Sequence, residues 1–258
     1  ARSFVAKAVY GYPFTRSLLE ALKTTPTLRR ICGFERVSDI PSESTFSRAF
    51  AEFAKSGLGE RVHDALVEDS LKPELIGHVS RDSTAIDGRE KPVKKTPKPK
   101  TAPRKRGRPA KGEEREPKEQ TRLERQREQS AWEALEELPA FCDVGTKKNS
   151  KGFKETWIGY KLHADVNDCG LPISVVLTAA SVHDSQVAIP LMRMSSAKVD
   201  YLYDVMDAAY DAGAIYEVSK SLGHVPLIDK NSRGKEVVPM APHEAVRYNE
   251  RTVVERFN

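Results

Sequence analysis

The second half of the chain constrains the fold most, because strand-like and helix-like segments follow one another there in a definite order. Residues 156–166 alternate apolar and polar side chains, as a half-buried strand does. Asp168-Cys169-Gly170 predicts a turn, after which residues 171–177 pair back as a hairpin. Two helix–strand pairs follow, at residues 184–194 with 199–206 and 212–222 with 225–228. This order predicts an α/β fold with a mixed sheet flanked by helices.

Three acidic residues lie far apart in the sequence but at comparable places in the predicted elements. Asp82 lies in a short predicted strand, Asp207 follows a second strand, and Glu255 lies on the last predicted helix. Strand alternation puts Asp207 and its competitor Asp204 on opposite faces, and the position at the strand end favours Asp207. Such a triad suits two divalent cations, Mg²⁺ or Mn²⁺, at a phosphodiester-cutting site. Without metal, the packed carboxylates repel, and at least one pKa is expected to rise.

The helix that carries Glu255 has a second polar feature. On a single helix, Tyr248, Arg251 and Glu255 fall within an arc of roughly 60°. Arginine can hold a phosphate with its planar fork, and tyrosine can contact the DNA backbone or stack on a base. The alternative is a surface stripe of ion pairs with Glu250 and Arg256.

These motifs resemble those of a known family, the bacterial insertion-sequence transposases of the DDE type. The similarity covers almost the whole chain apart from a basic stretch after Arg89. The matching segments, in the family's order, are Asp82-Ser83-Thr84, Gly159–His163, Ser181–Ser185, Asp207–Asp211, and Tyr248, Arg251 and Glu255. The last three fit a Tyr-x2-Arg-x3-Glu-x6-Lys signature. Its lysine would fall beyond Asn258 and the chain opens without methionine, so we expect a piece truncated at both ends.

The resemblance implies a ribonuclease-H-like catalytic domain and an enzyme that cleaves and transfers DNA strands during transposition. Asp82, Asp207 and Glu255 would be the catalytic residues and the ligands of two Mg²⁺ or Mn²⁺ ions. The implied partners are transposon ends and target DNA, bound by a homodimer in the bacterial cytoplasm, at the nucleoid. Two alternatives stay open, a truncated DNA-binding remnant without catalysis and a host nuclease without strand transfer.

Residues 1–75 predict a separate helical domain, followed by the catalytic domain over residues 76–258. Ser42 is a candidate N-cap for a helix that begins after Pro41. The helices joined near Gly33-Phe34 form either a DNA-binding helix-turn-helix or a bundle that packs on another part of the protein. The resemblance tilts the choice toward binding of DNA or of the element's ends.

Residues 88–150 predict an insertion between the first two strands of the catalytic domain. Residues 91–111 contain ten basic and no acidic residues, with five interleaved prolines, which predicts an extended or disordered stretch. Within it, Lys105, Arg106 and Arg108 are candidate DNA contacts. Arg106-Gly107-Arg108-Pro109 resembles an AT-hook, and the alternative is a nonspecific basic linker. Residues 113–138 alternate charges and predict one exposed helix.

Amino-acid composition excludes few classes of protein. The net charge of +5 points mildly toward a polyanionic partner. Three isolated cysteines argue against a disulfide framework or a structural zinc site. No apolar run approaches ~20 residues, so no membrane span is expected. Several other side chains are expected to be structural rather than catalytic: His163 and His183 as hydrogen-bonding groups, Lys161 as an exposed strand lysine, and Trp132 and Trp157 as packing residues.

Overall fold

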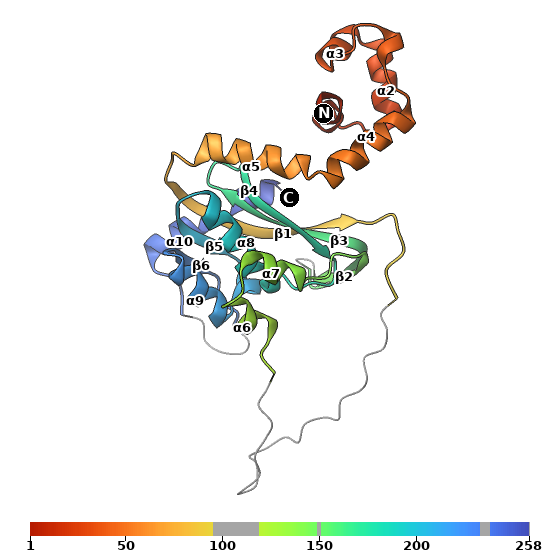
Figure 1. Ribbon diagram of the computed structural model, residues 1–258. Helices are drawn as coiled ribbons and strands as arrows, with labels where there is room; N and C mark the ends of the chain where they lie inside the picture. Colours follow the sequence, from red (N-terminus) through yellow and green to blue (C-terminus); the bar gives the residue numbers. More distant parts are fainter. Residues whose placement is uncertain (95–118, 149–150, 233–237, 258) are drawn as a thin grey trace, which may run out of the picture. The chain divides into compact units, whose positions relative to one another are not determined.

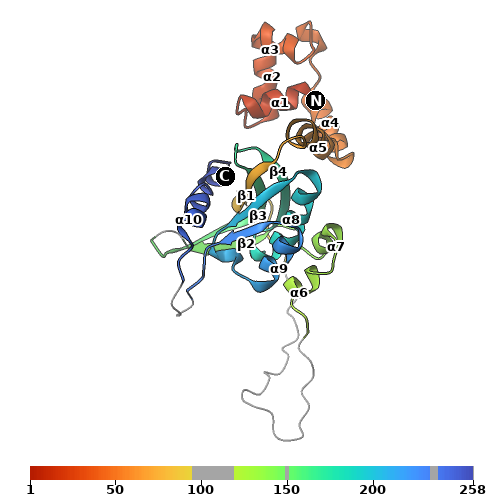
Figure 2. The ribbon, with the colours of Figure 1, turned by 90° about the vertical axis from the view of Figure 1, so that its left-hand side faces the viewer.

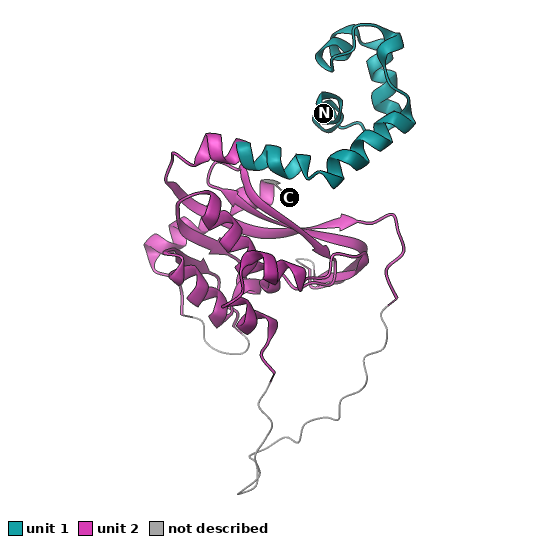
Figure 3. Ribbon diagram, in the orientation of Figure 1, with its two compact units in different colours: residues 1–65 teal, residues 66–258 magenta. Residues whose placement is uncertain are grey.

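The computed structural model describes residues 1–94, 119–148, 151–232 and 238–257 (Figure 1). The chain divides into two compact units, residues 1–65 and residues 66–258 (Figure 3). The candidate DNA contacts Lys105, Arg106 and Arg108 lie outside the described residues. In the part of the chain that is described, no helix is both long and apolar enough to cross a membrane.

The first unit is helical, as predicted. Its elements are α1 (Arg2–Val9), α2 (Thr15–Thr24), α3 (Pro26–Ile31), the 3₁₀ helix η1 (Val37–Asp39), α4 (Glu43–Lys55) and the start of α5 (Leu58–Leu71). Leu18 and Leu22, one helical turn apart on α2, are fully buried with Phe46 of α4. Phe4 of α1 meets Phe46 edge to face, with ring centroids 5.7 Å apart. These contacts form one small apolar core.

Helix α4 begins where the sequence predicts. The Ser42 hydroxyl accepts a hydrogen bond from the Thr45 backbone amide at 3.4 Å and so caps the helix. The connection at Gly33-Phe34 differs from the helix-turn-helix expectation. Residues 32–42, including η1, separate α3 from α4, whereas a helix-turn-helix uses a turn of about 3–4 residues.

The second unit is built on a six-stranded mixed sheet. Its strands are β1 (Ile76–Asp87), β2 (Asp143–Lys148), β3 (Lys154–Asn167), β4 (Pro172–Ala179), β5 (Tyr201–Met206) and β6 (Val225–Ile228). The order is β2-β3-β1-β5-β6, with β4 also paired to β3. β3 runs antiparallel to β1, β2 and β4, whereas β5 runs parallel to β1 and β6. The predicted β3–β4 hairpin and the mixed sheet are confirmed.

Helices cover both faces of this sheet (Figure 2). α8 (Ser185–Lys198) and α9 (Gly213–Ser221) lie on one face, where Met192, Met206 and Ile215 share a buried apolar cluster. α10 (Pro242–Asn249) lies on the other face, and α11 (Thr252–Phe257) contacts β1 and β3. The predicted fold class, an α/β mixed sheet with flanking helices after an all-helical N-terminal region, is confirmed.

Two expectations for residues 88–150 are wrong in part. The stretch contains a strand, β2, which pairs with β3 in the register Gly145↔Trp157. The helix predicted over residues 113–138 is, in its described part, two short helices, α6 (Arg122–Gln126) and α7 (Ala131–Glu136). Each begins with its own capping box, which explains the break between them. Gln126 and Ala134 are buried, so these helices are not wholly exposed.

The single helix predicted at the C-terminal end is also interrupted. α10 ends at Asn249, and Glu250 and Arg251 form a turn before α11 begins at Thr252. A further expectation fails at Trp132, which is 70% exposed on α7 and so is not a core packing residue. Periodicity identified the helical segments here but not their ends, because capping and tertiary contacts decide those.

Candidate active site

Asp82 and Asp207 emerge side by side from two neighbouring parallel strands. The β1–β5 register runs to Arg81↔Met206, and the residue that follows each of these two is one of the aspartates. The Arg81 guanidinium lies 3.2 Å from the Met206 sulfur, which puts these two side chains on one face of the sheet. Strand alternation therefore directs Asp82 and Asp207 to the opposite face, where the β1–β5 pairing ends, in the middle of β1 and directly after β5. Asp204, the competing acid, is fully buried on the Arg81 face.

Backbone amides hold both aspartates in place. Asp82 accepts a hydrogen bond from the Ser83 amide at 2.8 Å, and Asp207 accepts one from the Ala209 amide at 2.9 Å. The second contact makes Asp207 the N-cap of the 3₁₀ helix η2 (Ala208–Tyr210). The capping requirement explains why an aspartate suits the position directly after β5.

Glu255 reaches the same region from α11. A cavity of about 320 Å³ is lined by Asp82, Ser83, Thr84, Ala85, Lys147, Trp157, Lys161, Asp184 and Glu255. Glu255 is half-exposed, and its carboxylate pairs with Arg251 at 2.8 Å. Among the described residues, no group of three or more His, Cys, Asp or Glu side chains is arranged to hold a metal ion. The structure thus brings Asp82 into one cavity with Glu255, without a ready-made three-ligand cluster.

Burial dominates the electrostatics of the two aspartates. Burial raises the pKa of Asp82 to about 6, with smaller upward contributions from the charges of Asp207 and Asp184. The pKa of Asp207 is also raised, again chiefly by burial, and Asp184 adds to the effect. The expected rise is therefore present, but mutual repulsion is not its largest cause. Arg251 acts in the opposite direction on both carboxyls, so its charge is felt at each of them.

Tyr248, Arg251 and Glu255 stay together despite the break between α10 and α11. The Arg251 guanidinium lies 5.8 Å from the centroid of the Tyr248 ring and 2.8 Å from the Glu255 carboxylate. The alternative, a surface stripe of ion pairs, also describes part of this region, because Arg247 and Glu250 pair at 2.7 Å. Arg251 is thus the side chain between the aromatic ring and the acid.

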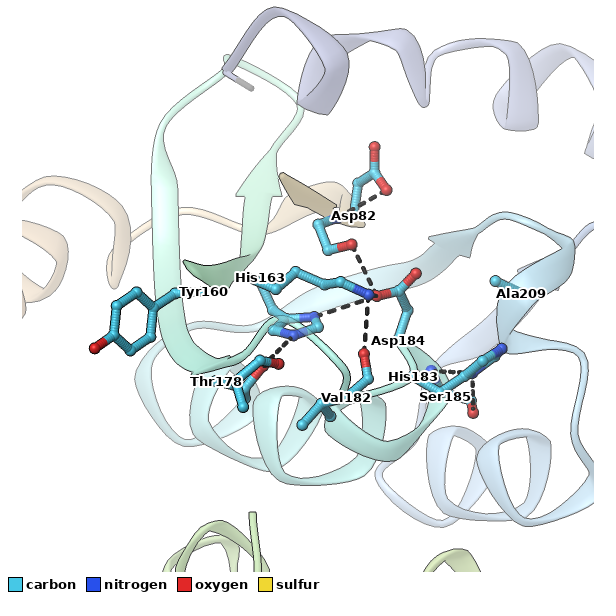
Figure 4. A network of polar contacts seen from close by, with 12 residues as sticks. Asp82, Tyr160, His163, Thr178, Val182, His183, Asp184, Ser185 and Ala209 are labelled. Atoms are coloured by element: carbon cyan, nitrogen blue, oxygen red, sulfur yellow. Dashed lines mark hydrogen bonds and ion pairs between the residues drawn. The ribbon is translucent and has the colours of Figure 1, made fainter. Parts of the chain in front are cut away.

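Asp184 is a further acid of the site that the sequence did not single out. At the N-terminus of α8 it accepts hydrogen bonds from the Ser83 hydroxyl at 2.8 Å and the Lys161 ammonium at 2.9 Å (Figure 4). Lys161 also donates to the Val182 carbonyl, and its side chain is only 13% exposed. The expectation of an exposed strand lysine is therefore wrong. The segment around Asp184 was visible in the sequence, but nothing local showed that its carboxylate returns to β1.

Both transposase-like parts of the chain match known protein families. Residues 80–258 match the family described as transposase DDE domain, and residues 1–52 match a transposase domain (DUF772). The chain belongs to the DDE transposase family. The observed sheet and flanking helices agree with the ribonuclease-H-like fold expected of this transposase. Searches of curated proteins and of solved structures returned no significant match. The Tyr-x2-Arg-x3-Glu-x6-Lys branch stays a prediction.

The two histidines of the transposase near the cavity make hydrogen bonds with hydroxyl groups. Buried His163 lies 3.0 Å from the Thr178 hydroxyl, and burial lowers the pKa of His163 to about 4, which favours a neutral ring. His183 lies 2.8 Å from the Ser185 hydroxyl (Figure 4). Trp157 covers Gly145 of β2 and lines the cavity, so it packs and also borders the site.

Proposed function

We propose that this transposase cuts DNA at transposon ends and joins the freed 3′ ends to target DNA, using Asp82, Asp207 and Glu255. One observation carries the proposal. Asp82 and Asp207 directly follow paired residues of two parallel strands, and Asp82 lines a cavity together with the helix-borne Glu255. Open α/β sheets bind ligands at the carboxyl ends of their strands. Asp207 follows the carboxyl end of β5, and Asp82 lies beside that end on β1. Membership of the DDE family supports DNA as the substrate.

The side chains suit divalent cations in chemistry. Carboxylate oxygens are the ligands that Mg²⁺ and Mn²⁺ prefer. The raised pKa of Asp82 reports that ionising this buried carboxyl is costly, and a nearby positive charge would lower that cost. Two such ions, when bound, activate the attacking water or 3′-hydroxyl and stabilise the leaving oxygen. We propose Asp82 and Asp207 as the ligands held in place, and Glu255 as a ligand that must first leave Arg251.

Arg251 and Tyr248 are proposed to bind the DNA strand. When Glu255 leaves Arg251, the planar guanidinium becomes available to a phosphate, which it can contact with two parallel N–H donors. The adjacent Tyr248 ring offers a surface for the sugar–phosphate backbone or an unpaired base. Because two transposon ends must be processed together, we also propose that two copies of the chain act on DNA as a homodimer.

A cleavage assay with single substitutions tests these roles. The three variants are Asp82→Asn, Asp207→Asn and Glu255→Gln. Each is expected to slow Mn²⁺- or Mg²⁺-dependent cleavage of DNA that carries a transposon end by at least about 100-fold. Loss of a residue that only orients a metal ligand costs up to about 100-fold, and loss of a ligand itself should cost at least as much. DNA affinity should change little. Asp200→Asn is a matched control, because Asp200 is exposed just before the amino end of β5.

The outcomes separate the competing functions. Wild-type cleavage by any of the three variants would remove that residue from the proposed site. Specific DNA binding by the wild-type chain without any cleavage would favour the non-catalytic DNA-binding alternative. Hydrolysis without joined products would instead favour a nuclease that performs no strand transfer.

A further inference from the structure

A buried ion network lies on the opposite face of the sheet from the proposed catalytic aspartates. The Arg81 guanidinium contacts the Asp165 carboxylate at 2.6 Å and the Asp204 carboxylate at 3.5 Å. The side chains of Asp165 and Asp204 are 0% exposed, and that of Arg81 is 1% exposed. The proposed function uses none of these three charges.

Arg81 lies one residue before the first aspartate and opposite the residue that precedes the second. It directly precedes Asp82 on β1, and Met206, the last residue of β5, directly precedes Asp207. Arg81 is in register with Met206 on one side and with Asp165 of β3 on the other. Its side chain contacts both, at 3.2 Å to the Met206 sulfur and 2.6 Å to Asp165. One guanidinium therefore links three strands directly beneath the site.

Helices α8 and α9, which cover this face, each donate a hydrogen bond to one of the two carboxylates. Ser195 of α8 donates to Asp165 at 2.6 Å, and Ser219 of α9 donates to Asp204 at 2.6 Å. The Tyr201 hydroxyl donates to Asp204 at 3.1 Å. The network thus connects β3, β1 and β5 to both covering helices. Asp165 has two polar partners and Asp204 has three.

Stability alone is a poor explanation for this arrangement. Removing three charges from water is costly, and apolar side chains of similar volume often stabilise a core equally well or better. A planar guanidinium offers instead a rigid fork that can bridge partners at fixed positions. That property suits a requirement for defined strand spacing.

We propose that Arg81 is a positioning residue for the cation-binding aspartates. By tying the middle of β1 to the end of β5, it fixes the separation of Asp82 and Asp207 and so sets their affinity for divalent cations. This inference rests on the proposed function, because it takes Asp82 and Asp207 as the ligands.

Titration with Mn²⁺ in the absence of DNA tests the inference. Arg81→Lys keeps the charge but loses the fork, so Mn²⁺ affinity, followed by the electron paramagnetic resonance signal of free Mn²⁺, should fall about 10-fold, as for loss of an outer-shell partner. Ile215→Val is the matched control, because it loosens the buried core on the same face and removes none of the network's charges or hydrogen bonds. Its Mn²⁺ affinity should stay within about 2-fold of wild type, which is small compared with the ~10-fold loss expected for Arg81→Lys.

Asp82→Asn in the same titration separates two kinds of failure. If Asp82→Asn binds Mn²⁺ as wild type does, the proposed function itself fails. If Asp82→Asn loses binding but Arg81→Lys keeps wild-type affinity, only the role of Arg81 is overturned. Should circular dichroism show that Arg81→Lys is unfolded, Asp204→Asn carries the test, because it removes the β5 carboxylate from Arg81. Unchanged affinity in that variant would then overturn the inference.

Discussion

At the scale of single residues, adjacent positions on one strand have opposite tasks. Arg81 points to the face covered by α8 and α9 and pairs with buried carboxylates, whereas Asp82 points to the other face and borders a cavity. The two-residue repeat of a strand produces this division without any special backbone geometry. Asp82 is left partly buried beside other acids, so its ionisation is costly in the folded chain.

This cost predicts a pH-dependent gain of stability in Asp82→Asn. The folded-state pKa of about 6 lies above the ordinary value of 3.8, so the group's contribution to stability is complete below 3.8 and is lost as the pH rises through 6. Without divalent cations, Asp82→Asn should therefore unfold with a free energy about 3 kcal/mol higher than wild type at pH 8, with little gain near pH 4.

Thermal melts in EDTA at the two pH values measure this difference. Asp69→Asn, at an exposed site on α5, is the control and should shift the melting temperature equally little at both. If Asp82→Asn melts at or below the wild-type temperature at pH 8, the raised pKa of the Asp82 carboxyl is contradicted.

At the scale of elements, the candidate site is shaped by two features, the close approach of neighbouring strands and the positions of helix ends. Helix and strand propensities matter less. β3 pairs with β1, β2 and β4, and at Gly159 it is in register with both Asp87 and Asp143. A Cβ at Gly159 would collide with the Ile86 carbonyl oxygen and the Gly88 amide nitrogen. Only glycine fits where these backbones meet, and this contact sets the far end of β1 relative to the cavity.

Gly159→Ala is therefore predicted to lower the free energy of unfolding by about 3 kcal/mol, because backbone atoms cannot move aside as a flexible side chain can. Gly213→Ala is the matched control. Its new methyl group meets open space at the start of α9, so stability should change little or rise by about 0.5 kcal/mol. Urea unfolding measures both variants, and equal midpoints would contradict the close-approach argument.

At the scale of the whole molecule, the site is assembled from distant segments. The four acids of the candidate site span most of the second unit. Asp82 lies on β1, Asp207 directly after β5, Asp184 directly before α8 and Glu255 on α11. Parallel pairing of β1 and β5 brings the first two acids together across more than a hundred residues of intervening chain. The basic segment over residues 91–111 lies within that intervening chain.

The charge of this segment predicts a salt-dependent contribution to DNA binding. Replacing Lys105, Arg106 and Arg108 by alanine should reduce the slope of log affinity against log salt by about 0.9 for each phosphate that is no longer neutralised, up to about 3 in total. The measurement is a salt series of equilibrium titrations on labelled duplex. Alanine at exposed Lys72, Arg127 and Lys220 removes the same charge and is the control.

An unchanged slope would show that the basic segment does not bind phosphates. An equal reduction of affinity on all duplexes would favour a nonspecific linker. A reduction confined to A·T-rich duplexes would favour the AT-hook, because a narrow minor groove attracts arginine there.

The sequence alone determined the fold class, the family resemblance and the order of elements over residues 156–228. Alternation, turn residues and helical spacing act locally, so residues 156–228 could be assigned to a hairpin and alternating helices and strands from a single chain. The spacing of Tyr248, Arg251 and Glu255 also predicted that their side chains adjoin, and they do so across a break that the pattern did not indicate.

Only the tertiary structure decided which side chains meet. The pairing of Asp184 with Ser83 and Lys161, and the network around Arg81, join residues separated by more than twenty positions, where no periodicity applies. Their partners are chosen by strand register and helix packing, which depend on the fold as a whole. For the same reason, β2 and the ends of the short helices escaped prediction, since neighbouring strands and capping contacts define them.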